Sequence, residues 1–187
     1  SKRIIQQGVE RLQELSRAFR LVCKLEAQAL VPQMKPVTAE DLASEVIAPF
    51  KDQLAEKKLT LNVTGFTDEV ILNTNKPLAQ LTLRSLIENA IQASKEGDSL
   101  VVKCLHSDGH TAFQVIDHGE GIPKEQLAQL FRPFVRVGPV TTFNREGIGL
   151  SLFLDRLIMH SLGGEVEIMS KFEQGTVATL TFATETA

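Results

Sequence analysis

Two pairs of short apolar runs, each joined by turn-forming residues, constrain the fold of this chain more than any other feature. SLVVKCLH and TAFQVID flank the turn SDGH, and GEVEIMS and TVATLTF flank KFEQG. Such pairs predict β-hairpins. Two further runs, LTLNVT (59–64) and VILN (70–73), predict strands around the turn GFTD. A sheet built mainly from hairpins is mixed or antiparallel, with helices on one face. The predicted fold is therefore a two-layer α/β sandwich of the α+β class.

A long amphipathic helix is predicted before this sandwich. Apolar residues recur at steps of three and four over residues 4–30, which is the pattern of one helix that needs a partner helix. The segment VPQMKP ends it. Thr38 then resembles an N-cap with Asp41 at the third helical position, and the following helical pattern contains Pro49, which bends or divides it.

Two more helices are predicted within the part of the sequence that forms the two-layer sandwich. Asn75 caps a helix that includes LTLRSLIENAIQAS, and GIGLSLFLDRLIMHSL is a helix closed by Gly163 and Gly164. Pro123 starts a short helical segment, PKEQLAQLF, and residues 131–146 are irregular.

Charge and composition exclude several classes of function. The net charge is −3, so no general field attracts nucleic acid. No apolar run approaches the roughly 20 residues that span a bilayer, so neither a membrane-spanning segment nor a signal peptide is expected from this sequence. We expect a cytoplasmic location, with membrane anchoring of a longer parent left open. Cys23 and Cys104 are expected to be buried thiols rather than a disulfide.

The stretch DHGEGIP (117–123) places a carboxylate at the end of a strand and two glycines directly after it. A tight turn needs one glycine at most, so two indicate a backbone that passes close to another group. Gly119 and Gly121 are expected to supply positive φ and to lack a Cβ where a ligand approaches. Asp117 can accept an N–H from that ligand.

Five sequence pieces now stand in a fixed order: LIENAIQAS, DHGEGIP, LFRPFVR, REGIGLSL and QGTVATLTF. Over residues 38–183 the sequence resembles the ATP-binding catalytic domain of sensor histidine kinases, within the wider family shared by Hsp90 chaperones, gyrase-type topoisomerases and MutL. The resemblance implies a Bergerat-type ATP-binding fold. It also implies ATP and Mg²⁺ as cofactors.

The resemblance assigns a role to individual residues. Asn89 would coordinate Mg²⁺ and bridge it to the phosphates, Asp117 would accept the exocyclic N–H of adenine, and Thr176 would place a hydroxyl beside Asp117. The implied catalytic residues are Asn89 and Arg136. The implied ATP-contacting residues are Asn89, Asp117, Gly119, Gly121, Ile122, Phe131, Arg145, Gly147, Gly149, Leu150 and Thr176.

The phosphates are expected at the start of the last predicted helix. Gly147 and Gly149 open it, and a glycine-rich helix start exposes N–H groups that suit phosphate. Phe131 and Phe134 are expected to anchor residues 131–146 as a lid over the nucleotide. Arg136, with Arg132 as a further candidate, would meet the γ-phosphate.

Three positions depart from the family pattern. Arg145 replaces the first glycine of its box, which leaves the local lid geometry open. Gln92 stands where kinases often carry a basic residue. Ser85 stands four residues before Asn89, where ATP-hydrolysing relatives carry a glutamate, so an ATPase of the chaperone or topoisomerase type is disfavoured.

None of the four histidines has the surroundings of a phosphoacceptor: they occur as LHSDG, GHTAF, DHGEG and MHSLG. The resemblance therefore implies a part of a longer kinase. Residues 1–31 would be half of the dimerisation and phosphotransfer hairpin, and residues 32–187 the ATP-binding domain. The expected partners are ATP or ADP, the upstream phosphoacceptor hairpin, the receiver domain of a response regulator and, in the parent, a second copy. An anti-sigma-type serine kinase and a non-catalytic nucleotide-sensing module are the alternatives.

Overall fold

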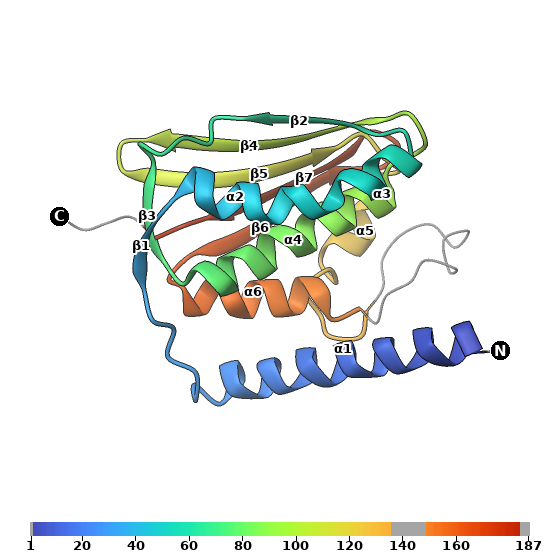
Figure 1. Cartoon of the computed structure of the whole chain (residues 1–187), viewed down its shortest axis with the longest axis horizontal. Coiled ribbons are helices and arrows are strands. Elements are labelled where there is room, and N and C mark those ends of the chain that lie inside the picture. Colours follow the sequence, from blue (N-terminus) through green and yellow to red (C-terminus); the bar gives the residue numbers. More distant parts are fainter. Residues whose placement is uncertain (1, 136–148, 184–187) are drawn as a thin grey trace.

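The computed structural model describes residues 2–135 and 149–183, arranged as a β-sheet with helices on one face (Figure 1). The strands are β1 (Lys35–Thr38), β2 (Thr60–Thr64), β3 (Ile71–Thr74), β4 (Ser99–Ser107), β5 (His110–Asp117), β6 (Glu165–Lys171) and β7 (Gly175–Thr181). The helices are α1 (Lys2–Glu26), α2 (Ala39–Ile47), the 3-10 turn η1 (Ala48–Phe50), α3 (Lys51–Glu56), α4 (Lys76–Ala93), α5 (Lys124–Leu127) and α6 (Ser151–Ser161). The predicted fold class, with its mixed sheet and long N-terminal helix, is confirmed.

The main sheet has five strands in the order β2-β4-β5-β7-β6. Strands β4, β5, β7 and β6 are antiparallel neighbours, which confirms both predicted hairpins, whereas β2 runs parallel to β4. A parallel pair requires a crossover of a dozen or more residues, and the segment containing α4 provides it. One edge strand, β2, thus makes an otherwise antiparallel sheet mixed.

Both strands predicted from the runs at 59–64 and 70–73 are present, but they do not pair with each other across the turn GFTD. β3 instead pairs antiparallel with β1 in a separate two-stranded sheet, and β1 was not predicted. Phe66 and Val70, in the segment between β2 and β3, are both buried. This connection is drawn into the core, so it cannot act as a tight hairpin turn.

Side-chain caps define where two of the helices begin. Thr38 Oγ1 accepts a hydrogen bond from the Asp41 backbone N–H at 3.1 Å, and Asn75 Oδ1 accepts one from Leu78 N–H at 3.2 Å. Each cap satisfies one of the free N–H groups of a helix start. The two predicted caps are confirmed. Pro49 lies in η1 and divides the second helical pattern into α2 and α3, as expected.

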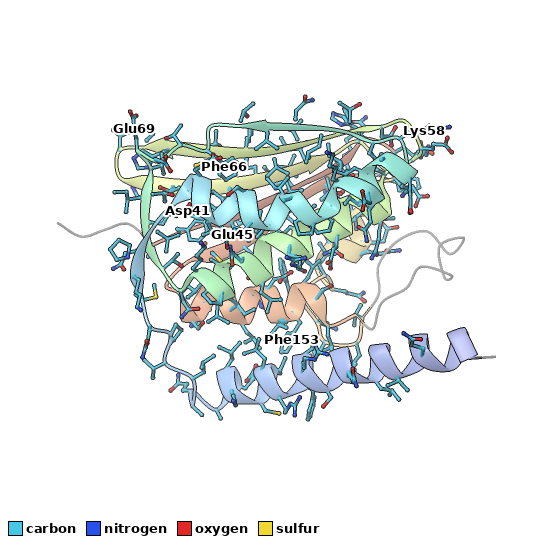
Figure 2. All side chains as sticks on the ribbon, viewed as in Figure 1. Asp41, Glu45, Lys58, Phe66, Glu69 and Phe153 are labelled. Carbon is cyan, nitrogen blue, oxygen red and sulfur yellow. The ribbon has the colours of Figure 1, made fainter. Side chains whose placement is uncertain are left out.

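The core lies between the sheet and the helices. Phe113 of β5 is fully buried and packs edge-on against Phe66, which Figure 2 labels, and against Phe182, with ring centroids 4.9 and 4.7 Å apart. Edge-to-face packing of this kind is favourable for aromatic rings. Alternate residues of β5 thus face the helices, and this alternation extends to Asp117 at its end.

Helix α1 lies along α6 on the side away from the sheet (Figure 1). Its last turns contact the core through Leu25 and its neighbours, and Phe153 of α6 points toward it (Figure 2). Leu12 and Phe19, two of the apolar residues that recur at steps of three and four along this helix, remain exposed. Cys23 is also exposed, contrary to prediction. Among the described residues, no helix is both long and apolar enough to cross a membrane.

Candidate functional site

Asp117 is the last residue of β5, and its side chain is 6% exposed on the helix-covered side of the sheet. Its Oδ1 accepts a hydrogen bond from the Gly119 backbone N–H at 2.9 Å. Burial raises the pKa of this carboxyl group, while the backbone N–H groups of Gly119 and Thr176 oppose the rise. The carboxylate is thus held by main-chain donors at a strand end, with acceptor capacity left for another group.

Three glycines around Asp117 allow segments of the protein itself to meet. A Cβ at Gly119 would collide with the carbonyl oxygen of Ala93, one at Gly121 with that of Lys171, and one at Gly175 with that of Asp117. Gly121 and Gly175 also have positive φ, of 63° and 101°. Gly119 does not, so the expectation that it supplies positive φ is wrong. It is required because the loop after Asp117 presses against the end of α4.

Asn89 lies one turn before the end of α4, close to the contact between Gly119 and Ala93. Its side-chain Nδ2 is buried and has no hydrogen-bond partner among the described residues. A buried amide without a partner is costly in a folded protein. An amide left open in this way fits a site that a ligand completes, which is the position expected for the phosphates and Mg²⁺.

Ser170 of β6 joins several parts of this site, although the sequence motifs do not single it out. Its Oγ lies 2.9 Å from the Ile122 backbone N, from the Gly175 carbonyl oxygen and from Thr176 Oγ1. Thr176 pairs directly with Asp117 across β7 and β5. The sequence does contain a signal for Ser170. It directly precedes the turn KFEQG of a predicted hairpin and Thr176 directly follows that turn, so the two residues lie opposite each other.

Helix α6 begins at Ser151, four residues after the predicted start at Gly147. Leu150 precedes it, is buried, and gives it no side-chain cap, so the N-cap residue itself satisfies none of the first N–H groups of α6 with its side chain. Gly149, with φ of 76°, lies in the bend before Leu150, and its carbonyl oxygen accepts from the Phe134 N–H at 2.9 Å.

The two phenylalanines expected to anchor a lid differ. Phe131 packs against the core, and the Arg156 guanidinium lies 5.2 Å from its ring centroid. Phe134 is 63% exposed, so its side chain is not an anchor in this structure. Arg132 is exposed. Arg136, Arg145 and Gly147 lie outside the described residues, as does most of the predicted lid.

A second buried carboxyl group lies between α4 and α6. Asp155 is 2% exposed, and its Oδ2 accepts a hydrogen bond from Ser85 Oγ at 2.7 Å. Burial raises the pKa of Asp155 well above its ordinary value; the Ser85 hydrogen bond lowers it, and the charge of Glu88 raises it further. The Ser85 hydroxyl therefore donates to Asp155. By the resemblance described above, Ser85 stands where ATP-hydrolysing relatives would carry a glutamate.

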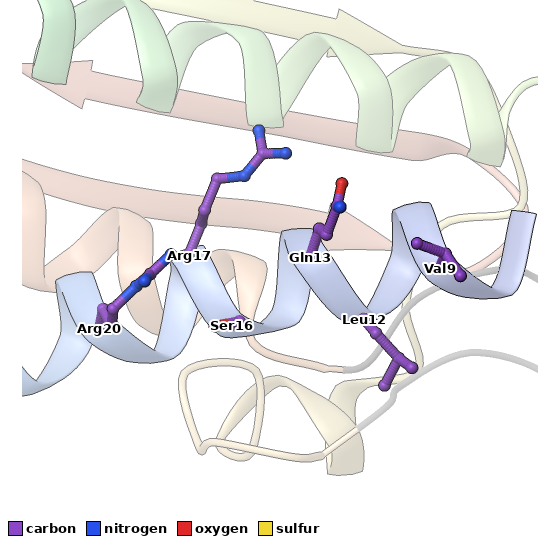
Figure 3. Close-up of a pocket in the computed structure, with 6 residues that line it drawn as sticks. All are labelled: Val9, Leu12, Gln13, Ser16, Arg17 and Arg20. Carbon is purple, nitrogen blue, oxygen red and sulfur yellow. The ribbon is translucent and has the colours of Figure 1, made fainter. Parts of the chain in front are cut away.

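A cavity of about 470 Å³ lies elsewhere, along α1 (Figure 3). Its lining residues are Val9, Leu12, Gln13, Ser16, Arg17 and Arg20. None of the predicted site residues lines it, so it is separate from the site around Asp117.

Comparison with known proteins identifies the family. Residues 74–186 match the family described as histidine kinase-, DNA gyrase B-, and HSP90-like ATPase. Sensor protein SrrB of Staphylococcus aureus is 26% identical over 170 residues, which are 89% of this chain and 28% of SrrB. The chain therefore spans little more than a quarter of the length of this curated relative.

Solved structures agree in fold. The histidine kinase AdeS of Acinetobacter baumannii matches with a TM-score of 0.77 and 23% identity, over 96% of this chain and 82% of AdeS. Full-length ShkA, solved in complex with AMPPNP, matches with a TM-score of 0.80 and 22% identity, over 97% of this chain and 38% of ShkA. The matched segment 74–186 contains Asn89, Asp117 and Thr176. The chain belongs to the family of histidine kinase-, DNA gyrase B-, and HSP90-like ATPases.

Proposed function

We propose that this chain is the ATP-binding catalytic part of a sensor histidine kinase and that it binds Mg·ATP at the site around Asp117. The observation that carries the proposal is the Asp117 carboxylate, buried at a strand end and held by backbone N–H groups within the segment that matches the family. A group placed in this way accepts the amino N–H of adenine and disfavours guanine, which has a carbonyl there.

The phosphates would lie between Asn89 and the start of α6. The side-chain Nδ2 of Asn89 lacks a hydrogen-bond partner among the described residues, and Leu150 gives the first N–H groups of α6 no side-chain cap. Free N–H groups at a helix start attract anions. Asn89 Oδ1, with phosphate and water oxygens, would hold Mg²⁺, which neutralises phosphate charge. Arg136, Arg145 and Gly147 complete the proposed contacts from outside the described residues.

The reaction proposed is transfer of the γ-phosphoryl group to a histidine. A ring nitrogen of the acceptor attacks the γ-phosphorus, the bond to the β–γ bridging oxygen breaks, and its electrons leave with ADP. Positioned charge, rather than covalent catalysis by the protein, drives such transfers. Asn89 and Arg136 are the residues proposed to act at the phosphates, and Asp117, Gly119, Gly121, Ile122, Phe131, Gly149, Leu150 and Thr176 those proposed to bind the rest of the nucleotide.

The division into residues 1–31 and 32–187 is part of this proposal. Helix α1 ends at Glu26, and an irregular segment separates it from β1. We assign α1 to the dimerisation and phosphotransfer hairpin of a cytoplasmic kinase core. The acceptor histidine would belong to another part of the parent, a second copy would complete the helical bundle, and a receiver domain would accept the phosphoryl group.

A thermal shift experiment tests nucleotide binding directly. Mg·ATP and Mg·ADP at a hundred times their dissociation constants should each stabilise the protein by about 2.7 kcal/mol, and Mg·GTP should not. Asp117→Asn should abolish most of the shift, because the amide oxygen would accept from the Gly119 backbone N–H and the amide NH2, a donor, would face the amino group of adenine. Asp68→Asn, at an exposed position, should keep the full shift. No shift with either adenine nucleotide would contradict the proposal.

Phosphoryl transfer needs a second experiment, which separates the kinase from a non-catalytic nucleotide sensor. The chain incubated with labelled ATP alone should acquire no stable phosphohistidine. Adding the helical hairpin of its own full-length parent should give a labelled hairpin. ATP binding without any labelling of that hairpin would favour the sensor.

A further inference from the structure

Three polar side chains lie in one row across the helix-covered face of the sheet. Asp117 of β5 pairs with Thr176 of β7, and Thr176 pairs with Ser170 of β6. Directly opposed residues of antiparallel strands have Cβ atoms about 4.5–5.5 Å apart. A single ligand group can therefore contact both Asp117 and Thr176, while Ser170 lies behind Thr176.

The hydrogen bonds of Ser170 determine the direction of each proton in this row. The Ile122 backbone N–H can only donate, so Ser170 Oγ accepts from it at 2.9 Å. The Gly175 carbonyl oxygen can only accept, so Ser170 donates its single proton to it, also at 2.9 Å. Ser170 has no second proton, so at its 2.9 Å contact with Thr176 Oγ1 it must accept. Thr176 is the donor of that bond.

The proton of Thr176 is thus committed to Ser170, and only lone pairs of its Oγ1 remain for a ligand. Asp117 beside it is also an acceptor, since the backbone N–H groups of Gly119 and Thr176 point at its carboxylate. Two adjacent acceptors match an amino group, which carries two N–H bonds. A carbonyl at the same place would face oxygen on both sides.

We propose that Ser170 is a specificity-determining positioning residue: it fixes the Thr176 hydroxyl as an acceptor, so that this end of the site admits an amino group and rejects a carbonyl. The inference rests on the proposed nucleotide function and adds to it the source of the base preference. Ser170 acts through Thr176 and does not touch the base.

Ser170 also holds the loops at Ile122 and Gly175, so a purely structural role must be distinguished. Looser loops would weaken the binding of every nucleotide by the same factor. A fixed hydroxyl instead changes the ratio between ligands that differ in one group. ATP and ITP are such a pair, because ITP replaces the amino group of adenine by a carbonyl and keeps the same ribose and phosphates.

The experiment measures dissociation constants of Mg·ATP and Mg·ITP by calorimetry for the wild-type chain, Ser170→Ala and Ser170→Thr. The wild type should prefer ATP. In Ser170→Ala the Thr176 hydroxyl is free to turn and donate to the carbonyl of ITP, so the preference should fall about fivefold or more, the equivalent of one hydrogen bond. Ser170→Thr keeps a hydroxyl and should restore the preference. If Ser170→Ala does not fold, Ser170→Cys replaces it, because a thiol fills the space but is a weak donor and acceptor.

Each other outcome has a definite meaning. If Ser170→Ala, or Ser170→Cys in its place, weakens the binding of ATP and of ITP by the same factor, the inference is overturned and the proposed function stays intact. A wild type that binds ATP and ITP equally would overturn it as well. A wild type that binds neither nucleotide would overturn the proposed function itself, and this inference with it.

Discussion

The end of β5 and the interface between α4 and α6 each bury one carboxyl group, and the two surroundings differ. Asp117 is 6% exposed and Asp155 2%. Asp117 has backbone N–H donors on its carboxylate, whereas the hydrogen bond found at Asp155 comes from one serine hydroxyl. Main-chain donors stabilise a charge, and a lone hydroxyl compensates burial far less. Similar burial therefore leaves the Asp117 carboxylate able to accept a further hydrogen bond and favours the neutral form of Asp155.

The largest effect on stability is expected from Gly175→Ala, which forces apart the backbones of Gly175 and Asp117. The new Cβ would collide with the Asp117 carbonyl oxygen at a residue of φ 101°, and the free energy of unfolding should fall by about 3 kcal/mol or more. Gly97→Ala is the matched control. Its φ is 84° but no atom lies within 4 Å of the point where its Cβ would stand, so only backbone strain of about 1–2 kcal/mol applies. Equal losses in urea denaturation would contradict the role assigned to the contact.

Asp155→Asn tests the neutral form of the other carboxyl group. Folding raises the pKa of Asp155, so the contribution of this group to stability is greatest below the ordinary Asp pKa and falls as pH rises toward the folded value. The asparagine variant lacks this loss. Its advantage over the wild type should grow with pH by up to about 1.4 kcal/mol per unit in that window. Parallel curves of unfolding free energy against pH would show that Asp155 is not buried in its neutral form.

Ser85→Ala should have a smaller effect, because it removes the hydroxyl that donates to Asp155 and leaves the carboxyl group in place. A loss of about 1 kcal/mol is expected at neutral pH. The double variant with Asp155→Asn measures the coupling: the two changes should be non-additive if the 2.7 Å bond connects them. Strict additivity would indicate that the two side chains act independently.

The smallest effect is expected at an exposed acid. Glu45, labelled in Figure 2, accepts from Lys76 Nζ at 2.8 Å and from Gln80 Nε2 at 2.9 Å. The Lys76 hydrogen bond, followed by that of Gln80, lowers the pKa of Glu45, so its contribution is present at neutral pH and is lost as pH falls through the folded value. Glu45→Gln should therefore reduce stability slightly at neutral pH and not in acid, as followed by urea denaturation. A loss comparable to that of Ser85→Ala would contradict this ranking.

Local signals predicted much of the fold and part of the site. Hydrophobic alternation and turn residues identified both hairpins, and Thr38 and Asn75 marked helix starts through their side chains. The pairing of β2 could not be predicted in this way, because its partner β4 begins only at Ser99, after β3 and the whole of α4. β1 was missed for the same reason: it becomes a strand only through its distant partner β3.

The candidate site shows the same limit. The two glycines that follow Asp117 mark it as a candidate site residue, and this signal is contained in a few consecutive residues. Asp155 lies within an apolar helix and Ser85 in another, and only the packing of α4 on α6 brings them together. The positive φ expected of Gly119 was wrong, and its close contact with Ala93 could not be predicted because Ala93 belongs to a separate element.

The close contacts at Gly119, Gly121 and Gly175 have a consequence for reading other sequences of this fold. Each missing Cβ is required by the protein's own carbonyl groups, whether or not a nucleotide is bound. A degenerate copy that had lost catalysis would still need these glycines in order to fold. Their presence alone therefore cannot separate a working enzyme from a pseudoenzyme, and the positions to inspect are those equivalent to Asn89 and Asp117, which are proposed to hold the phosphates and the base.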